Sequence, residues 1–165
     1  MSVSRLSLRP ATPEDVPHIL AFIRELAEYE KLTHEVSATE ELLQRTLFGP
    51  KPFAETLIGS VDDVPAGFAV YFYSYSTFLA LPGIYLEDLY VQPKFRKLGL
   101  GKALITEVAR IAVERGCGRY EWSVLDWNTP SIRFYESLGA EMHRDWRRMR
   151  ISGPALEEMA KICVR

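Results

Sequence analysis

A glycine-rich segment with the sequence RKLGLGK, residues 96–102, is the first candidate for chemistry. Glycines allow a backbone to approach a phosphate group closely, and the free N–H groups at the start of a following helix favour negative charge. The segment differs from a P-loop, because Ala103 stands where Ser or Thr is required, and from a dinucleotide fingerprint, because Leu104 replaces a small residue. The spacing indicates either an anion site that would fit a pyrophosphate or a glycine-eased loop before a helix.

Two adjacent carboxylates, Glu87 and Asp88, interrupt the apolar run 84–91. A carboxylate embedded in an apolar strand needs a physical reason to be there, either proton transfer or a charged partner. Glu87 is the preferred candidate for a base, and Asp88 ranks below it. Alternation along a regular strand sends the two side chains to opposite faces, so both reach one cleft only if a bulge intervenes. An ion pair with an arginine explains either residue equally well.

Tyr135 lies in a short helix expected over residues 129–138 and closed by Gly139. Core packing is the ordinary role of a tyrosine in this setting, where it directly follows Phe134. Asn128 and Thr129 are both candidates for the N-cap of the helix. From the residues alone, packing and capping explain this segment.

The composition is that of an ordinary globular protein. Of the 165 residues, 47% are hydrophobic and 25% are charged, which excludes a largely disordered or collagen-like chain. The length is near that of one domain, about 100 to 150 residues, so we expect a single domain over residues 1–165. Twenty Lys and Arg against 22 Asp and Glu give a net charge of −2, which offers no broad basic field for nucleic acid.

Cysteine usage and apolar runs indicate the compartment. Cys117 and Cys163 are too few for a disulfide scaffold, and no His/Cys cluster has zinc-ligand spacing, so we expect no metal site. No apolar run reaches the about 18 residues of a membrane helix, and residues 1–10 lack the apolar core of a signal peptide. We therefore expect a cytoplasmic protein that does not enter a membrane.

The hydrophobic periodicity predicts an α/β layered fold. The expected strands are 3–9, 54–61, 67–75, 84–91 and 120–125, with a last strand within 140–151, and the expected helices are 12–29, 39–47, 98–115, 129–138 and one after Pro154. Turn residues at 62–65 predict a hairpin between the second and third strands. The strongest helix has a buried stripe of Leu100, Leu104, Val108 and Ile111, and the second helix has one of Leu42, Leu43 and Leu47.

Three motifs in order resemble the GNAT N-acetyltransferase superfamily. They are RKLGLGKA at 96–103, YLEDLYV at 85–91 before it, and NxxSIxFYxxxGA at 128–140 after it. RPAT at 9–12, ELAEYEK at 25–31 and VLDWN at 124–128 extend the resemblance over nearly the whole chain. Within the superfamily, the chain is most similar to the diamine (spermidine/spermine) acetyltransferases and the thialysine acetyltransferases.

The resemblance implies one domain whose central sheet is mixed, mainly antiparallel and flanked by helices. It implies a splay where 84–91 and 120–125 part to admit acetyl-CoA, and it implies a homodimer. Backbone N–H groups from Lys97 to Lys102 would hold the pyrophosphate, and the pantetheine arm would pair with residues 89–91. The residues expected to bind acetyl-CoA are Leu89, Tyr90, Val91, Arg96, Lys97, Leu98, Gly99, Leu100, Gly101, Lys102, Asn128 and Ser131.

The resemblance also implies direct acetyl transfer to a primary amine in a ternary complex. Such an amine has a pKa of about 10.4, so it must lose a proton before it attacks the thioester. Glu87 is the expected base or water-relay acceptor, and a backbone N–H near Leu89 would hold the oxyanion. Tyr135 stands where family members use a tyrosine as the general acid that protonates the departing thiolate.

The acceptor amine is expected to bind through acidic side chains, namely Glu30, Glu35, Glu87 and Asp88. Thr33 and His34 occupy positions that are acidic in polyamine-acetylating members, and fewer carboxylates should weaken long polyamines most. We therefore expect a small primary amine, with thialysine or a lysine-like amino acid ahead of spermidine and spermine.

Alternatives to small-molecule acetylation stay open. The chain could be an acyl-CoA-binding sensor or interaction module without efficient transfer, or it could acetylate lysine in proteins or peptides. The segment 29–36 could equally be a solvated surface, with specificity set elsewhere, for example by residues 73–81. The presence of both Glu87 and Tyr135 favours an enzyme over a binding module.

Overall fold

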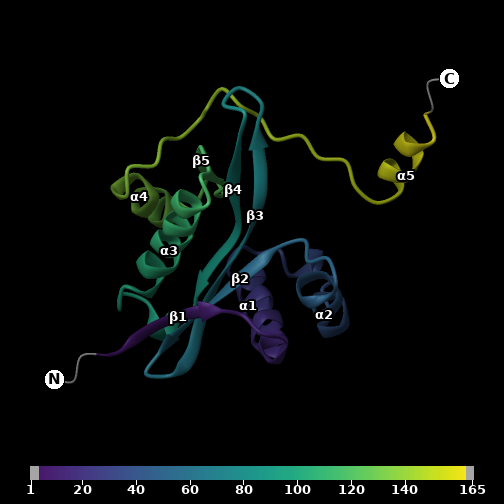
Figure 1. Ribbon diagram of the computed structural model, residues 1–165. Helices are drawn as coiled ribbons and strands as arrows, with labels where there is room; N and C mark the ends of the chain where they lie inside the picture. The colour runs from purple at the N-terminus through teal and green to yellow at the C-terminus, as the bar shows by residue number, and fades with distance from the viewer. Residues whose placement is uncertain (1–3, 163–165) are drawn as a thin grey trace. The chain divides into compact units, whose positions relative to one another are not determined.

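The computed structural model describes residues 4–162 (Figure 1). They form two compact units, one ending at Ser123 and the other beginning at Val124. The first unit contains a five-stranded sheet of β1 Leu6–Pro10, β2 Glu55–Val61, β3 Val64–Ser76, β4 Leu81–Val91 and β5 Arg119–Trp122, in the order β1-β2-β3-β4-β5. The first four strands run antiparallel to their neighbours, and β5 runs parallel to β4. The predicted mixed, mainly antiparallel sheet is therefore confirmed.

Helices cover both faces of this sheet. The first unit contains η1 Pro13–Asp15, α1 Val16–Tyr29, η2 Thr33–Glu35, α2 Glu40–Phe48, η3 Pro93–Phe95 and α3 Leu100–Glu114. On β2, Ile58 belongs to a core cluster with Ile19 and Phe22 of α1, whereas Gly59 lies against Leu100 and Leu104 of α3. Because successive strand residues point to opposite faces, α1 and α3 pack on opposite sides of the sheet, as Figure 1 shows.

The packing of α3 follows its predicted apolar stripe. Leu100, Leu104 and Val108 are buried, as is Ile111. A Cβ atom added at Gly59 would come within 2.9 Å of Leu100 Cδ1, so the first turn of α3 rests directly on the sheet backbone. Full burial of a leucine side chain contributes about 2 kcal/mol. This contact fixes the start of α3 at a defined height above the sheet.

The hairpin between β2 and β3 is confirmed, and its turn is tighter than predicted. Asp62 and Asp63 have φ values of 49° and 65°, and two successive positive φ values match the twist of hairpin strands. The backbone N–H of Arg5 donates to Asp62 Oδ1 at 2.8 Å, which ties the turn to the segment leading into β1. As a result β3 begins at Val64, three residues before the predicted start.

The second unit contains α4 Thr129–Ser137 and α5 Pro154–Ala160. The amide oxygen of Asn128 accepts a hydrogen bond from the Ser131 backbone N–H at 3.4 Å, which confirms Asn128 as the N-cap of α4. Gly139 follows the helix with a φ of 90°, the left-handed conformation that ends helices. Both predicted helices of this part of the chain are therefore confirmed.

The strand predicted within 140–151 is wrong, because the described part of the chain has no strand there. Four of the seven residues from 144 to 150 are arginines, so the segment lacks the alternating apolar face that holds a strand against a core. Residues 141–151 are exposed. The apolar residues near Met142 do not continue as an alternating pattern along the rest of this segment.

Smaller differences concern the ends and faces of elements. β1 begins at Leu6, and Val3, the predicted first residue, lies outside the described residues, as does Cys163. The stripe predicted on α2 is wrong in part, because Leu42 is exposed and Leu43 only half-buried. Within residues 4–162, no helix has the length and apolar character needed to cross a membrane.

Candidate active site

The sheet parts between β4 and β5. β5 pairs only with the first portion of β4, from Gly83 to Leu86, while β4 itself continues to Val91. In the described part of the first unit, no strand pairs with residues 87–91 on the side of β5. Backbone N–H and C=O groups along an unpaired edge can bind an extended ligand that carries amides. The predicted splay of the sheet is therefore present, and the predicted residues Leu89, Tyr90 and Val91 line it.

A β-bulge lies at the start of the splay. On β3, Val70 pairs with Asp88 and the next residue, Tyr71, pairs with Leu86, so Glu87 is the extra residue of β4. A bulge brings two successive side chains to one side of a strand. Val70 packs against the core cluster under α1, and paired residues share a face, so Asp88 faces the α1 side. The bulge that Glu87 and Asp88 need in order to share a cleft is therefore present.

The charges of two other carboxylates act on Asp88 at this bulge. Burial, then repulsion from Glu87 and from Glu30, raises the pKa of Asp88 to about 7. Burial also raises the pKa of Glu30. Glu87 itself is exposed and Asp88 is half-buried. A cationic ligand would relieve this repulsion, because an opposite charge within a few ångströms favours the ionised carboxylates.

Glu30 directly follows the last residue of α1. Its backbone N–H donates to the Leu26 carbonyl at 2.9 Å, and Lys31 then turns the chain with a φ of 61°. Glu35, the other predicted acceptor carboxylate, lies on the exposed turn η2, where its side chain is 3.5 Å from His34. The structure thus places Glu87 and Asp88 at one bulge with the charge of Glu30 acting on Asp88, and it gives Glu35 a different neighbour.

The loop from Lys97 to Gly99 has the geometry of an anion seat. Lys97 and Gly99 have φ values of 65° and 91°, and left-handed residues within a turn direct successive N–H groups toward one point. α3 begins immediately afterwards at Leu100, so its first N–H groups are unpaired within the helix. Leu98 and Lys102 are exposed.

Gly101 is not required by the packing of the chain. A Cβ atom there would only touch Val91 Cγ2 at 3.7 Å, an ordinary contact. Glycine within a helix costs about 1 kcal/mol relative to alanine. This glycine leaves room for close approach of a ligand to the backbone, which is the role predicted for it.

The Arg96 side chain has a role that the sequence did not indicate. Its Nε–H donates to the Val91 carbonyl at 3.0 Å, and its guanidinium carbon lies 5.1 Å from the ring centre of Tyr29 and 5.7 Å from that of Tyr90. Tyr29 is distant in sequence, so no local spacing could reveal this contact. Arg96 therefore connects the loop with the end of α1.

In the second unit, the predicted residues lie on and before α4. Asn128 is buried and Ser131 half-buried. Tyr135 is half-buried, and its ring centre lies 5.4 Å from that of Phe134. Capping by Asn128 does not decide whether this residue or Ser131 also contacts acetyl-CoA, so their binding roles and the acid role of Tyr135 stay predictions.

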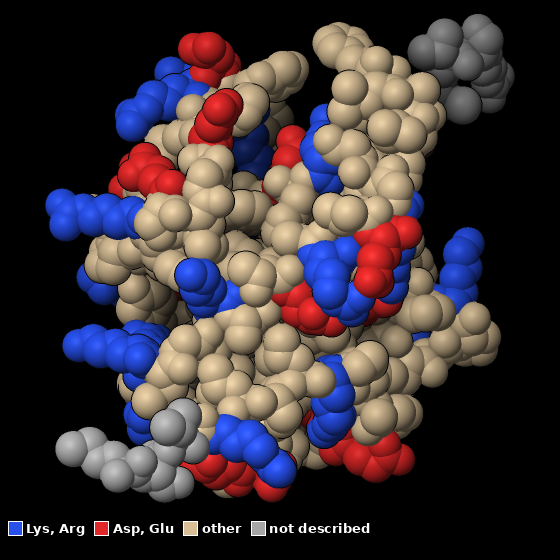
Figure 2. Space-filling view, turned by 60° about the vertical axis from the view of Figure 1, so that its left-hand side comes forward, with Lys and Arg blue, Asp and Glu red and all other residues tan. Residues whose placement is uncertain are grey.

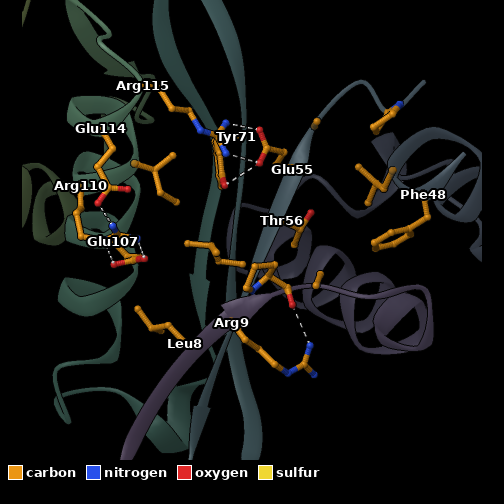
Figure 3. A pocket seen from close by; sticks show the side chains of 17 residues that line it. Leu8, Arg9, Phe48, Glu55, Thr56, Tyr71, Glu107, Arg110, Glu114 and Arg115 are labelled. Carbon is orange, nitrogen blue, oxygen red and sulfur yellow. Dashed lines mark hydrogen bonds and ion pairs between the residues drawn. The ribbon is translucent and has the colours of Figure 1, made fainter. Parts of the chain in front are cut away.

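A cavity of about 500 Å³ lies at the edge of the sheet formed by β1, where β2 begins (Figure 3), and none of Glu30, Glu87 and Asp88 lines it. Arg115 donates to Glu55 Oε1 at 2.5 Å and to Oε2 at 2.8 Å, and the Tyr71 hydroxyl donates to Oε2 at 3.3 Å. Arg110 is similarly paired with Glu107 at 2.6 Å. These charges neutralise one another, so this cavity is not the candidate active site. Among residues 4–162, no group of three His, Cys, Asp or Glu side chains could hold a metal ion.

Comparison with known proteins decides the family. The sequence pattern of the acetyltransferase (GNAT) family matches residues 20–140. The chain belongs to the GNAT family. As a GNAT protein it is an acetyl-CoA-dependent N-acetyltransferase, which agrees with the unpaired edge of β4 and the anion seat before α3.

Curated GNAT relatives resemble nearly the full chain. A thialysine N-epsilon-acetyltransferase of Sus scrofa is 38% identical, over 93% of this chain and 96% of its own. An L-ornithine N5-acetyltransferase of Arabidopsis thaliana is 34% identical, over 94% of this chain and 88% of its own. An integron cassette protein of V. cholerae has the same fold, with a TM-score of 0.79 at 24% identity over 94% of this chain and 98% of that one.

Proposed function

We propose that this GNAT enzyme transfers the acetyl group of acetyl-CoA to the primary amine of a small lysine-like amino acid or diamine. The observation that carries the proposal is the bulge in β4, which places Glu87 and Asp88 beside the unpaired edge of the strand, where the charge of Glu30 also acts on Asp88. A protonated primary amine is the ligand that such carboxylates stabilise. The names of the thialysine and L-ornithine acetyltransferases among its relatives support an acceptor with an aliphatic amine.

Proton removal is assigned to the carboxylates at the bulge. The acceptor arrives as an ammonium ion and must give up a proton. A carboxyl with a pKa near 7 holds and releases a proton at neutral pH, so Asp88 joins Glu87 as the group that accepts it. The neutral nitrogen then forms the C–N bond, a backbone N–H near Leu89 holds the carbonyl oxygen, the C–S bond breaks, and Tyr135 gives its proton to the thiolate.

Among acceptors, we rank thialysine and lysine-like amino acids ahead of spermidine and spermine. Thr33 and His34 leave the η2 segment with one carboxylate, Glu35. A long polyamine would have ammonium groups without partners there, and an unpartnered charge near a protein surface loses hydration without compensation.

The remaining proposals concern assembly and location. We propose that the two units act together as one acetyltransferase domain over residues 1–165, that the enzyme is a homodimer, and that it works in the cytoplasm without nucleic acid or membrane partners. Figure 2 shows Lys and Arg interspersed with Asp and Glu over the visible face, a distribution that does not favour a phosphate backbone. Light scattering at micromolar concentration tests the dimer, and a monomeric mass would contradict it.

The deciding experiment is a thiol-release assay with acetyl-CoA and a panel of acceptors. The panel contains thialysine, lysine, ornithine, diaminobutane, spermidine, spermine and a lysine-bearing peptide. We expect the highest kcat/KM for one of the amino acids, and a maximum for spermine would contradict the ranking. Tight acetyl-CoA binding without thiol release from any acceptor would instead support an acyl-CoA-binding module.

Tyr135→Phe tests the general acid. Loss of the phenol proton should lower kcat by about a hundredfold, because a positioned acid contributes on this scale, while the dissociation constant of acetyl-CoA changes little. Equal turnover of the variant and the parent enzyme would remove Tyr135 from the mechanism.

A further inference from the structure

The guanidinium of Arg96 lies between two tyrosine rings that belong to different elements. Tyr90 is on β4, and Tyr29 is the last residue of α1. The ring centres of Tyr29 and Tyr90 are 5.1 Å and 5.7 Å from the guanidinium carbon, within the range of a cation–π interaction. A hydrogen bond from Nε to the Val91 carbonyl at 3.0 Å fixes the side chain along the strand.

The β4 side of this contact is rigid. The Tyr90 hydroxyl donates to Glu25 Oε2 at 3.0 Å, and the Gln92 side-chain amide donates to both carboxylate oxygens of Glu25 at 2.9 Å and 3.1 Å. Tyr90 is buried, with its ring 6.4 Å from that of Phe22. Glu25 and Phe22 are both on α1, so the body of this helix is fastened to the end of β4.

The α1 end of the contact is more exposed. Tyr29 is 37% exposed, and the next residue is Glu30, whose carboxylate raises the pKa of Asp88. Lys31 then leaves the helix in a left-handed conformation. A shift of Tyr29 therefore moves the adjacent residue Glu30 and the segment that leads to η2.

The other side of Arg96 is the anion seat. Arg96 directly precedes Lys97, the first left-handed residue of the loop, and its own N–H is held by the Pro93 carbonyl at 3.2 Å. A phosphate drawn to the N–H groups of residues 97–102 will fix the backbone from which the Arg96 side chain extends. Ordering of the loop thus orders the guanidinium against Tyr29.

We infer that Arg96 and Tyr29 are positioning residues that couple the two substrate sites. Acetyl-CoA at the loop strengthens the contact of Arg96 with Tyr29 that the structure already shows, and Tyr29 in turn stabilises the position of Glu30 for the acceptor ammonium. This inference rests on the proposed function of Glu30 in amine binding. The coupling is reciprocal, because an effector that raises the affinity for a second ligand is itself bound more tightly in its presence.

The test measures both substrates in the full-length protein with Tyr29→Leu and Arg96→Lys. Leucine keeps the apolar bulk without a ring face, and lysine keeps the charge without a planar group. Calorimetry gives the dissociation constant of CoA with and without the best acceptor, and steady-state assays give the acceptor KM. In the parent protein we expect the acceptor to tighten CoA binding about fivefold, the lower end of typical coupling.

In Tyr29→Leu, the acceptor KM should rise about fivefold, as expected for loss of a partly exposed cation–π contact. CoA binding without acceptor should stay within about twofold, and the tightening by the acceptor should disappear. Arg96→Lys should lose the same tightening, and the double variant should lose no more than either single variant. Tyr29→Phe keeps the ring and should keep the coupling, which excludes a merely structural effect.

Lys94→Met is the matched control. Lys94 is a cation two residues from Arg96, with its Nζ 4.8 Å from the ring centre of Phe95, and it has no part in the proposed sites. Its removal should leave the acceptor KM and the coupling as in the parent protein. Equal loss of coupling in Lys94→Met would show a general charge effect and overturn the inference.

The outcomes separate this inference from the proposed function. Turnover of an amine by the parent enzyme, with normal coupling in Tyr29→Leu, overturns the inference and leaves the function intact. Absence of both turnover and acceptor binding across the panel overturns both. Loss of coupling in Tyr29→Leu and Arg96→Lys, with Tyr29→Phe normal, establishes it.

Discussion

Two acidic sites on the same sheet are built in opposite ways. At the start of β2, Glu55 accepts hydrogen bonds from Arg115 and Tyr71, and the bonds from Arg115 lower its pKa. At the bulge in β4, Asp88 has Glu87 and Glu30 as its charged neighbours, and its pKa is raised to about 7. A carboxylate with its own cation contributes to the fold, whereas carboxylates placed against one another cost stability and are suited to a cation from outside.

The largest expected effect separates the two sites by activity. Asp88→Asn should lower kcat/KM by about a hundredfold or more, because a neutral amide cannot accept the proton of the ammonium group. The parent enzyme should gain activity as pH rises through about 7, the pH at which Asp88 ionises. Initial rates of thiol release between about pH 5.5 and 9 measure both effects.

Glu114→Gln is the control for this substitution. Glu114 is an exposed carboxylate at the end of α3, paired with Arg110, and its loss should leave kcat/KM unchanged. A normal rate in Asp88→Asn would assign proton removal to Glu87. It would also contradict the catalytic difference between Asp88 and the paired Glu55 site.

The second effect concerns stability and pH. The pKa of Asp88 lies above its unfolded value of 3.8, so the unfolded state ionises first and the folded state loses stability as pH rises from about 4 to 7. Asp88→Asn removes this loss. Its advantage in Tm over the parent protein should grow by about 4 °C between about pH 5 and pH 8.

Thermal unfolding at the two pH values, in one buffer series, tests this expectation. A constant difference in Tm would show that Asp88 ionises alike in both states, and the contrast with Glu55 would then vanish.

The smallest effect is expected at the paired site. Glu55→Gln should lower the free energy of unfolding by about 1 kcal/mol, because the side chain is partly exposed and its ion pair is screened by water. The loss should shrink at acid pH, since the lowered pKa makes the contribution of Glu55 disappear as it protonates. Urea unfolding at about pH 7 and pH 3.5 measures the change.

The activity of Glu55→Gln distinguishes a structural role of Glu55 from a catalytic one. We expect a kcat/KM near that of the parent enzyme, because Glu55 faces Arg115 and Tyr71 rather than the bulge. A large loss of turnover would place the edge cavity in the reaction after all.

The sequence correctly predicted the helices and strands whose formation depends on neighbouring residues. The stripe from Leu100 to Ile111 predicted α3 because helical periodicity and burial coincide there. The apolar run before the glycine loop likewise predicted β4. The strand expected within 140–151 is wrong because this arginine-rich segment has no continuous alternating apolar face to pack against a core.

The sequence predicted individual site residues, but it did not predict the interactions between residues that are far apart in the chain. Alternation along the strand predicted that Glu87 and Asp88 share a face only if a bulge intervenes. The register with Val70 and Tyr71 on β3 shows that this bulge is present. Burial raises the pKa of Asp88 most, with Glu87 and then Glu30 adding to the shift, and the guanidinium of Arg96 lies near the ring of Tyr29. Tyr29 is the last residue of α1 and Glu30 directly follows it, so the packing of this helix against β4 sets the positions of both.

The unpaired stretch of β4 also has a consequence for solubility. An exposed strand edge is a template on which another chain can add by main-chain hydrogen bonding, and bulges and charged side chains are the features that prevent such growth. Residues 87–91 carry both at one point, the bulge and its two carboxylates. The acidic pair that we assign to catalysis therefore also opposes edge-to-edge pairing of this strand with another chain, and acetyl-CoA bound along the edge would block the same pairing.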